Sequence, residues 1–134
     1  MPVQWTDDLA TGIERIDEQH RELYRRVAGL HDAMRGGRLD DVPGMLDYLQ
    51  RYAVEHFAAE EKQMAAAGYP GLGQHRRLHQ RFVEEFLEHR KRLSPQVTAS
   101  AVVALSRWIT AWLGDHVRKV DGEMARYLRR QGAD

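Results

Sequence analysis

Apolar residues recur every three or four positions along almost the whole chain, a spacing typical of amphipathic helices. Short breaks divide this pattern into four segments, at residues 11–35, 41–67, 72–93 and from about 97 onward. Gly36 and Gly37 end the first segment, and Pro95 separates the last two. We expect Asp41 to cap the second segment and Pro43 to lie in its first turn, where a missing N–H costs little. Four helices with short connections predict an all-α fold, an antiparallel up-down-up-down four-helix bundle with a short N-terminal arm.

Length and charge exclude several kinds of partner. The 134 residues are a usual length for one domain, so we expect a single domain over residues 1–134. Basic and acidic residues number 20 each, so the chain lacks the positive surplus that drives binding to nucleic acid or anionic membranes. No apolar run approaches the roughly 20 residues that span a bilayer, and no secretion signal is visible. We therefore expect a monomeric cytoplasmic protein that binds no nucleic acid and does not insert into membranes.

Polar residues interrupt the apolar stripes in a regular way. His56 and Glu60 are four apart, as are His75 and His79, so the members of each pair share one helical face. In an antiparallel bundle these pairs fall at the same end, together with three further residues, and the complete set is His20, His56, Glu60, His75, His79, His116 and Asp121. The chain has no cysteine, so any ligands must be imidazoles and carboxylates. Five imidazoles and two carboxylates predict a metal site with too many ligands for one ion.

A single histidine on an apolar face is more often a structural core residue than a ligand. The prediction of a metal site therefore depends on all seven residues lying at the same height along the bundle. The two remaining histidines serve as controls. His31 lies eleven residues after His20, which on a helix is about 16 Å away. His89 is similarly remote from His79. We therefore place neither in the site.

His116 and Asp121 are five residues apart, which on a regular helix separates them by about 140°. Two arrangements are open. The two side chains can approach a centre from both sides, or the helix can widen locally through a π-type turn, a feature often found at functional sites. Gly122 follows Asp121 and would ease such a distortion, because glycine tolerates irregular backbone.

Taken together, these motifs resemble those of the hemerythrin family, specifically its single-domain bacterial members. The resemblance covers nearly the entire chain and includes Trp5, "GIERIDEQH", "HFAAEEKQM" followed by "GYP", "HRRLH", and "WLGDHVRKVD". It implies two non-haem iron ions bridged by Glu60, Asp121 and an oxo or hydroxo group. It further implies that one iron is held by His75, His79 and His116, and the other by His20 and His56. Glu61 faces about 100° away from Glu60 and is not expected to be a ligand.

The family resemblance implies that dioxygen binds reversibly at the open position of the second iron. Such a protein would carry or store oxygen or deliver it to an oxygen-using enzyme through a transient contact. The ligand set agrees, because diiron oxidases of similar bundles use Glu-x-x-His pairs and this chain contains none. Two alternatives stay open, a module that senses oxygen or redox state through a partner, and a dimetal hydrolase. We expect four residues one turn from the ligands to line an oxygen pocket: Leu23, Ala53, Trp112 and Leu113.

Overall fold

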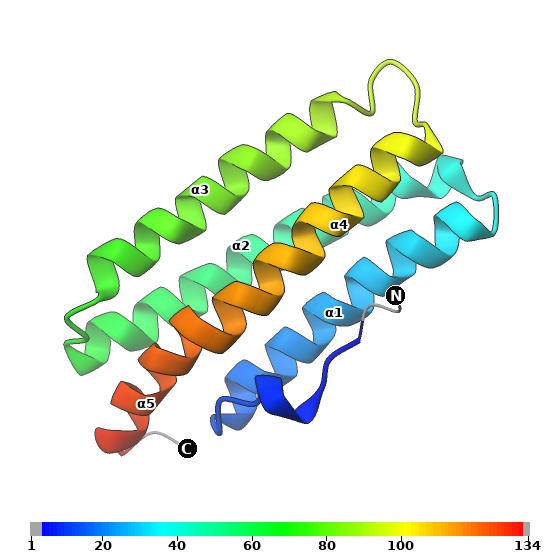
Figure 1. The fold of residues 1–134 in the computed structure, drawn as a ribbon. Helices are drawn as coiled ribbons and strands as arrows, with labels where there is room; N and C mark the ends of the chain where they lie inside the picture. Colours follow the sequence, from blue (N-terminus) through cyan, green and yellow to red (C-terminus); the bar gives the residue numbers. More distant parts are fainter. Residues whose placement is uncertain (1–3, 133–134) are drawn as a thin grey trace.

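Four long helical rods form the protein and run alternately up and down, as seen in the computed structural model, which describes residues 4–132 (Figure 1). The elements in chain order are η1 (Asp7–Leu9), α1 (Glu14–Arg35), η2 (Leu39–Asp41), α2 (Val42–Ala67), α3 (Leu72–Lys91), α4 (Ala99–Asp115), η3 (His116–Asp121) and α5 (Gly122–Arg130). Contacts link α1 with α2, α2 with α3, α3 with α4, and α4 with α1. This closed ring confirms the predicted antiparallel four-helix bundle.

The breaks in the sequence end the helices as expected. Gly68 ends α2 with φ of +66°, a left-handed conformation that favours glycine, and the next residue, Tyr69, donates its N–H to the Met64 carbonyl at 2.9 Å. Thr98 begins α4 by accepting the N–H of Ala101 at 3.3 Å. The expected cap of α2 is wrong. Asp41 makes no capping hydrogen bond, because its backbone is already helical at the end of η2.

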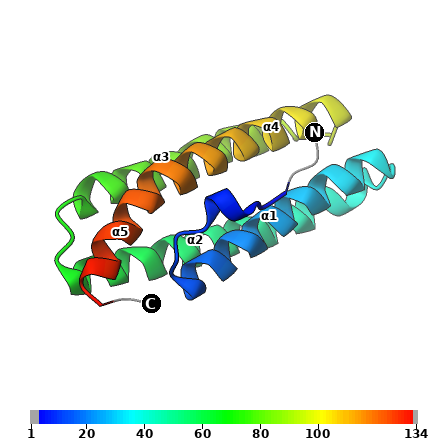
Figure 2. The same cartoon turned by 60° about the horizontal axis from the view of Figure 1, so that its bottom comes forward.

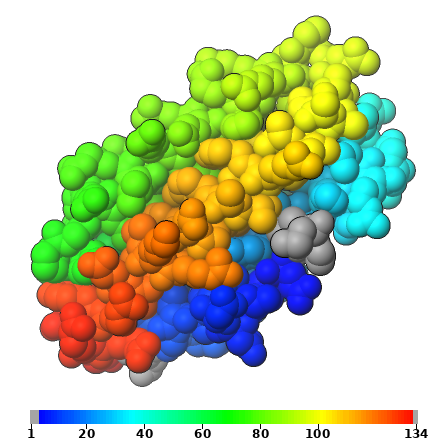
Figure 3. Space-filling model, viewed as in Figure 1, coloured from blue at the N-terminus to red at the C-terminus, as the bar shows by residue number. Residues whose placement is uncertain are grey.

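The N-terminal arm, residues 4–13, lies along the bundle between α1 and the α4–α5 rod (Figures 2 and 3). Its attachment is the buried Asp17 carboxylate, which accepts hydrogen bonds from the N–H and hydroxyl of Thr11, both at 2.7 Å, and from the Gly12 N–H at 3.2 Å. Arg118 donates to Asp8 at 2.9 Å, and Arg129 donates to the Thr11 carbonyl at 3.1 Å. The arm is thereby tied to α1, η3 and α5.

Apolar side chains fill the bundle in two clusters. The larger cluster extends through most of the length of the helices and includes Val27, Leu30, Leu46 and Leu105, each fully buried. The smaller cluster lies at the other end and consists of Ile13, Ile16, Met64, Met124, Ala125 and Leu128. Within residues 4–132, no helix combines the length and apolar character that crossing a bilayer requires. The two clusters leave a buried polar layer between them.

Candidate metal centre

The polar layer contains all seven residues that the sequence singled out as ligands. Each is nearly inaccessible, with side chains from α1, α2, α3 and η3, and the exposed fraction ranges from 0 % at His20 to 6 % at His116. Their donor atoms fall into two overlapping groups, and within each group the atoms lie within 4.8 Å of one another. The three-histidine group contains His75, His79 and His116, the two-histidine group contains His20 and His56, and both groups share Glu60 and Asp121.

The two carboxylates divide their oxygens between the groups. Glu60 Oε2 lies 3.3 Å from His20 Nε2 and 3.1 Å from His56 Nε2, while its Oε1 lies 3.3 Å from His79 Nε2. Asp121 repeats this division, with Oδ2 at 3.0 Å from His20 Nε2 and Oδ1 at 2.9 Å from His75 Nε2. Each carboxylate therefore presents one oxygen to each histidine group, an arrangement that suits two neighbouring cations.

The distances between donor atoms also suit metal binding. Donors at right angles around a metal, each about 2.1 Å from it, lie about 3 Å apart. His116 Nε2 lies 3.2 Å from both His75 Nε2 and Asp121 Oδ1, as such a shell requires. Six buried atoms of these seven residues lack a hydrogen-bond partner: His20 Nδ1, His75 Nδ1, Glu60 Oε1, His79 Nε2 and both oxygens of Asp121. Burying unpartnered polar atoms costs free energy, and two cations would satisfy His79 Nε2 and the carboxylate oxygens.

A π-helix brings His116 and Asp121 onto the same side. η3 spans His116–Asp121 with π-type hydrogen bonding, in which residues five apart become neighbours. This settles the two arrangements that the sequence left open in favour of the widened turn. Gly122 contributes no special backbone freedom, because its φ of −61° and ψ of −42° are those of an ordinary helix. A Cβ at Gly122 would meet only ordinary contacts at 3.7 Å and beyond.

Charges within the layer are strongly coupled. Burial would raise the pKa of the Glu60 carboxyl, but His56 and its neighbours hold that pKa well below its usual value. Burial would lower the pKa of His20, yet hydrogen bonds and charge from Asp121 and Glu60 raise it to about 10, and the same balance raises the pKa of His75 to about 9. At His116 burial prevails and lowers the pKa. The raised pKa values of His20 and His75 favour their protonated forms beside the carboxylates, and a metal ion that binds these rings must displace the proton.

Comparison with known proteins agrees with this geometry. Residues 11–128 match the profile of the hemerythrin HHE cation binding domain. The chain belongs to the hemerythrin family. It is 35 % identical over 117 residues to a bacteriohemerythrin of Stenotrophomonas maltophilia, covering 87 % of this chain and 75 % of the relative. It is 30 % identical over 118 residues to a bacteriohemerythrin of Methylococcus capsulatus, covering 87 % and 89 %. A myohemerythrin of Riftia pachyptila is 28 % identical over 120 residues, covering 90 % of this chain and 88 % of the relative.

Two residues that contact the histidines of this hemerythrin domain were not found from the sequence. Gln19 Oε1 lies 2.6 Å from His56 Nδ1, and Glu61 Oε2 lies 2.9 Å from His79 Nδ1. Both contact the ring nitrogen that faces away from the shared carboxylates. Glu61 is indeed placed away from the cluster of donor atoms, as expected, but it orients one of the histidines. In the sequence Glu61 stands out only because it directly follows Glu60, and this position does not indicate a contact with His79.

The four residues expected to line a pocket belong to the larger apolar cluster or pack against it. Leu23, Ala53 and Leu113 are buried in the larger apolar cluster, and Trp112 packs against it. The Trp112 ring stacks on the ring of His116, with centroids 4.2 Å apart and planes inclined by 13°. Because His116 belongs to the three-histidine group, this contact places the Trp112 ring against that group. The two rings meet because positions four apart share one helical face.

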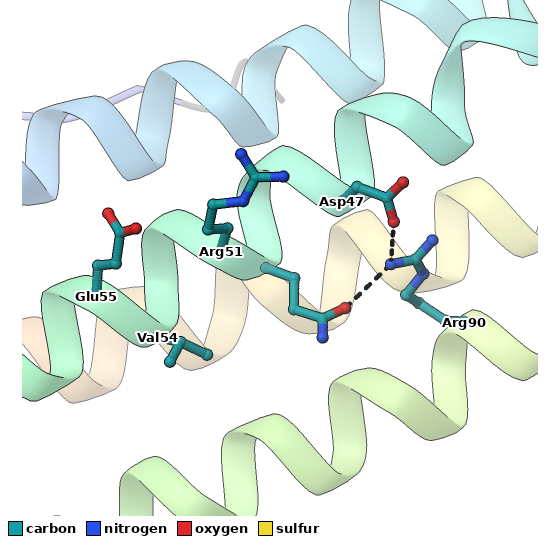
Figure 4. Close-up of a pocket in the computed structure, with 6 residues that line it drawn as sticks. Asp47, Arg51, Val54, Glu55 and Arg90 are labelled. Atoms are coloured by element: carbon teal, nitrogen blue, oxygen red, sulfur yellow. Dashed lines mark hydrogen bonds and ion pairs between the residues drawn. The ribbon is translucent and has the colours of Figure 1, made fainter.

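Two surface hollows differ in their relation to the centre. One, of about 350 Å³, is bordered by Leu78, Trp108, Ala111, Trp112, Asp115, His116, Lys119 and Val120, so it reaches a histidine of the centre. The other lies over α2 and α3 and contains Asp47, Arg51, Val54, Glu55 and Arg90 (Figure 4). There Arg90 bonds Asp47 at 2.9 Å and Gln50 at 3.0 Å. None of these lining residues belongs to the metal centre, so we assign this second hollow no function.

Replacing Glu60 by alanine removes the carboxylate that touches both histidine groups, so we expect Glu60→Ala to lose the paired metal site. His89→Ala is the matched control, because His89 stacks on Trp108 outside the seven-residue cluster. Elemental analysis of both purified variants, with circular dichroism to check folding, measures the outcome. An empty site in His89→Ala beside a full one in Glu60→Ala would show that the ligand assignment is wrong.

Proposed function

We propose that this hemerythrin-family protein binds dioxygen reversibly at a pair of non-haem iron ions. The observation that supports the proposal most directly is the unequal division of histidines around two shared carboxylates. Three histidines on one side complete the surroundings of one metal, whereas two on the other side leave a position free for an external ligand. The relatives are named bacteriohemerythrin and myohemerythrin, which agrees with an oxygen-binding role.

In the proposed centre, Glu60 and Asp121 would be shared by the two irons, and an oxo or hydroxo group would complete the bridge. His75, His79 and His116 would hold one iron, and His20 and His56 would hold the other. The iron pair supplies the electrons that bind oxygen. The chain fixes the histidines, keeps both carboxylates ionised in an apolar interior and limits the access of water.

Binding of oxygen is favoured over its consumption by the ligand set. Related bundles that activate oxygen use four carboxylates and two Glu-x-x-His pairs, whereas this centre has two carboxylates and five histidines. Fewer anionic ligands leave the centre more positive, so it releases electrons less readily. We therefore propose a carrier, a store or a delivery protein for an oxygen-using enzyme.

The purified protein should contain two irons per chain and should show a visible absorption band that appears with oxygen and disappears when oxygen is removed. Seven ligands arranged around two shared carboxylates provide for two metals, and the free position provides for reversibility. Elemental analysis and anaerobic and aerobic visible spectra measure both properties. One iron per chain, or two zinc ions from cells grown with ample iron, would contradict the diiron proposal.

Trp112 is placed to limit access of water to the centre. Its ring covers a face of His116 beside the hollow of about 350 Å³ that opens to solvent. It also contacts Phe82 and Phe57, with ring centroids 4.4 and 5.9 Å apart. These aromatic contacts hold the indole in place over one face of His116, at the border of the hollow.

We expect Trp112→Ala to keep both irons but to autoxidise severalfold faster than the parent protein, because water and protons would let oxygen leave as hydrogen peroxide, with one electron taken from each iron and both irons left ferric. Trp112→Phe should accelerate autoxidation less, since a smaller ring still covers part of His116. The decay of the oxygenated band in air-saturated buffer measures the rate, alongside iron content and thermal stability. If Trp112→Ala is less stable but autoxidises at the parental rate, Trp112 contributes packing alone.

A further inference from the structure

Two histidines of the centre have hydrogen-bond partners of different charge on the ring nitrogen that faces away from the shared carboxylates. His79 contacts the carboxylate of Glu61, and His56 contacts the amide of Gln19. The two histidines belong to different groups, so each proposed metal has one of them. Both contacts involve Nδ1, the nitrogen opposite the one that faces the shared carboxylates. The difference between the partners is thus a difference between the two metal positions.

Around His79 the contact is anionic and rigid. A carboxylate only accepts hydrogen bonds, so His79 Nδ1–H donates to Glu61 Oε2 over 2.9 Å, which leaves Nε2 free to bind a metal. Arg76, one turn before His79 on α3, donates to the other oxygen of Glu61 at 3.2 Å. Phe57 stacks on the His79 ring with centroids 3.9 Å apart and planes inclined by 9°. The ring of His79 is therefore fixed in plane and in direction.

Around His56 the contact is neutral. Gln19 on α1 places Oε1 2.6 Å from His56 Nδ1, so the amide oxygen accepts the Nδ1–H and again leaves Nε2 free. Gln19 carries no charge, and its contact orients the ring without adding negative charge behind it. His56 and Gln19 are 37 positions apart and come from α2 and α1.

A carboxylate behind a metal-bound imidazole makes the imidazole a stronger donor than an amide does. The added electron density and the nearby negative charge favour a metal of higher charge. From these contacts we infer that Glu61 and Gln19 are positioning residues that make the two metals unequal. Glu61 favours the ferric state of the metal in the three-histidine group, and Gln19 leaves the metal in the two-histidine group relatively electron-poor. This inference rests on the proposed function, since it assigns a division of roles within the same centre.

The electron balance is simple. Each iron loses one electron when it passes from ferrous to ferric, and in a redox titration a soluble chemical oxidant such as ferricyanide takes it up. No bond to Glu61 or Gln19 forms or breaks, and both residues act only through the hydrogen-bonded imidazoles. Glu61 therefore stabilises the ferric product and lowers the midpoint potential, whereas Gln19 has a smaller effect.

Two substitutions that hardly change the shape of the side chain test the inference, because they should shift the midpoint potential in opposite directions. Glu61→Gln removes the charge and keeps an acceptor for His79, so it should raise the midpoint potential of the centre. Gln19→Glu adds a charge behind His56, so it should lower the midpoint potential. Glu55→Gln is the matched control, because Glu55 is an exposed residue of α2 that lines the hollow with no part in the centre (Figure 4). Potentiometric titration of the iron-loaded proteins measures all three shifts.

A second measurement avoids iron and oxygen altogether. Zinc competition against a chromophoric chelator reports ligand strength alone, and loss of such an outer partner typically weakens metal binding about 10- to 100-fold. We expect Glu61→Gln to bind one zinc ion more weakly by about this factor and Glu55→Gln to match the parent. Gln19→Glu should bind zinc at least as tightly as the parent.

Potential shifts of the same sign in Glu61→Gln and Gln19→Glu, or a shift in Glu61→Gln no larger than that in Glu55→Gln, would overturn the inference. Unchanged zinc affinity in Glu61→Gln would do so as well. If Glu61→Gln fails to fold, Gln19→Glu still decides by the sign of its shift. Should the parent protein hold no iron pair, the proposed function fails separately, and zinc competition still tests the contact between Glu61 and His79.

Discussion

The structure depends on two carboxylates buried in an apolar interior. Glu60 and Asp121 are each 1 % exposed, and removing a carboxylate from water costs on the order of several kcal/mol unless positive charge compensates it. Five histidines surround them, and apolar clusters close the layer on both sides. Protonated histidines can supply part of this positive charge, and the arrangement of donor atoms suits two cations, which would supply the rest. Metal binding at this level of the bundle would then be coupled to the stability of the fold.

Much of this arrangement could be predicted from the sequence because it follows from periodicity. Helical spacing together with the Gly and Pro breaks predicted the four helices, with ends displaced by at most three residues. The alternating direction of the helices was then enough to predict that His20, His56, His75 and His116 lie at the same height along the bundle, because this prediction needs no side-chain contacts. Asp41 shows where local chemistry misled. Asp is a frequent helix cap, but here the backbone of Asp41 is already helical at the end of η2 and continues into α2, and its side chain makes no capping hydrogen bond.

The remaining features depend on contacts between helices, which periodicity does not describe. A spacing of five between His116 and Asp121 fits two geometries, and only the backbone of η3 distinguishes them. Gln19 contacts His56 across 37 positions, and Glu61 contacts His79 across 18, so each pair depends on how two helices are rotated against each other. The stacking of Trp112 on His116 is a local contact, yet the side of the centre that it covers depends on packing in the same way.

The N-terminal arm contacts two of the elements that supply residues to the centre, α1 and η3. His20 on α1 and Asp121 on η3 approach to 3.0 Å, although η3 departs from regular helical hydrogen bonding just where Asp121 is presented. The arm is anchored to α1 through Asp17 and reaches the η3 side through the ion pair of Asp8 with Arg118 at 2.9 Å. The exposed ion pair contributes little by itself, but the buried hydrogen bonds of Asp17 hold the arm in register with α1. The arm is therefore fixed chiefly to α1, through the buried carboxylate of Asp17, and extends from that anchor to the outer side of η3.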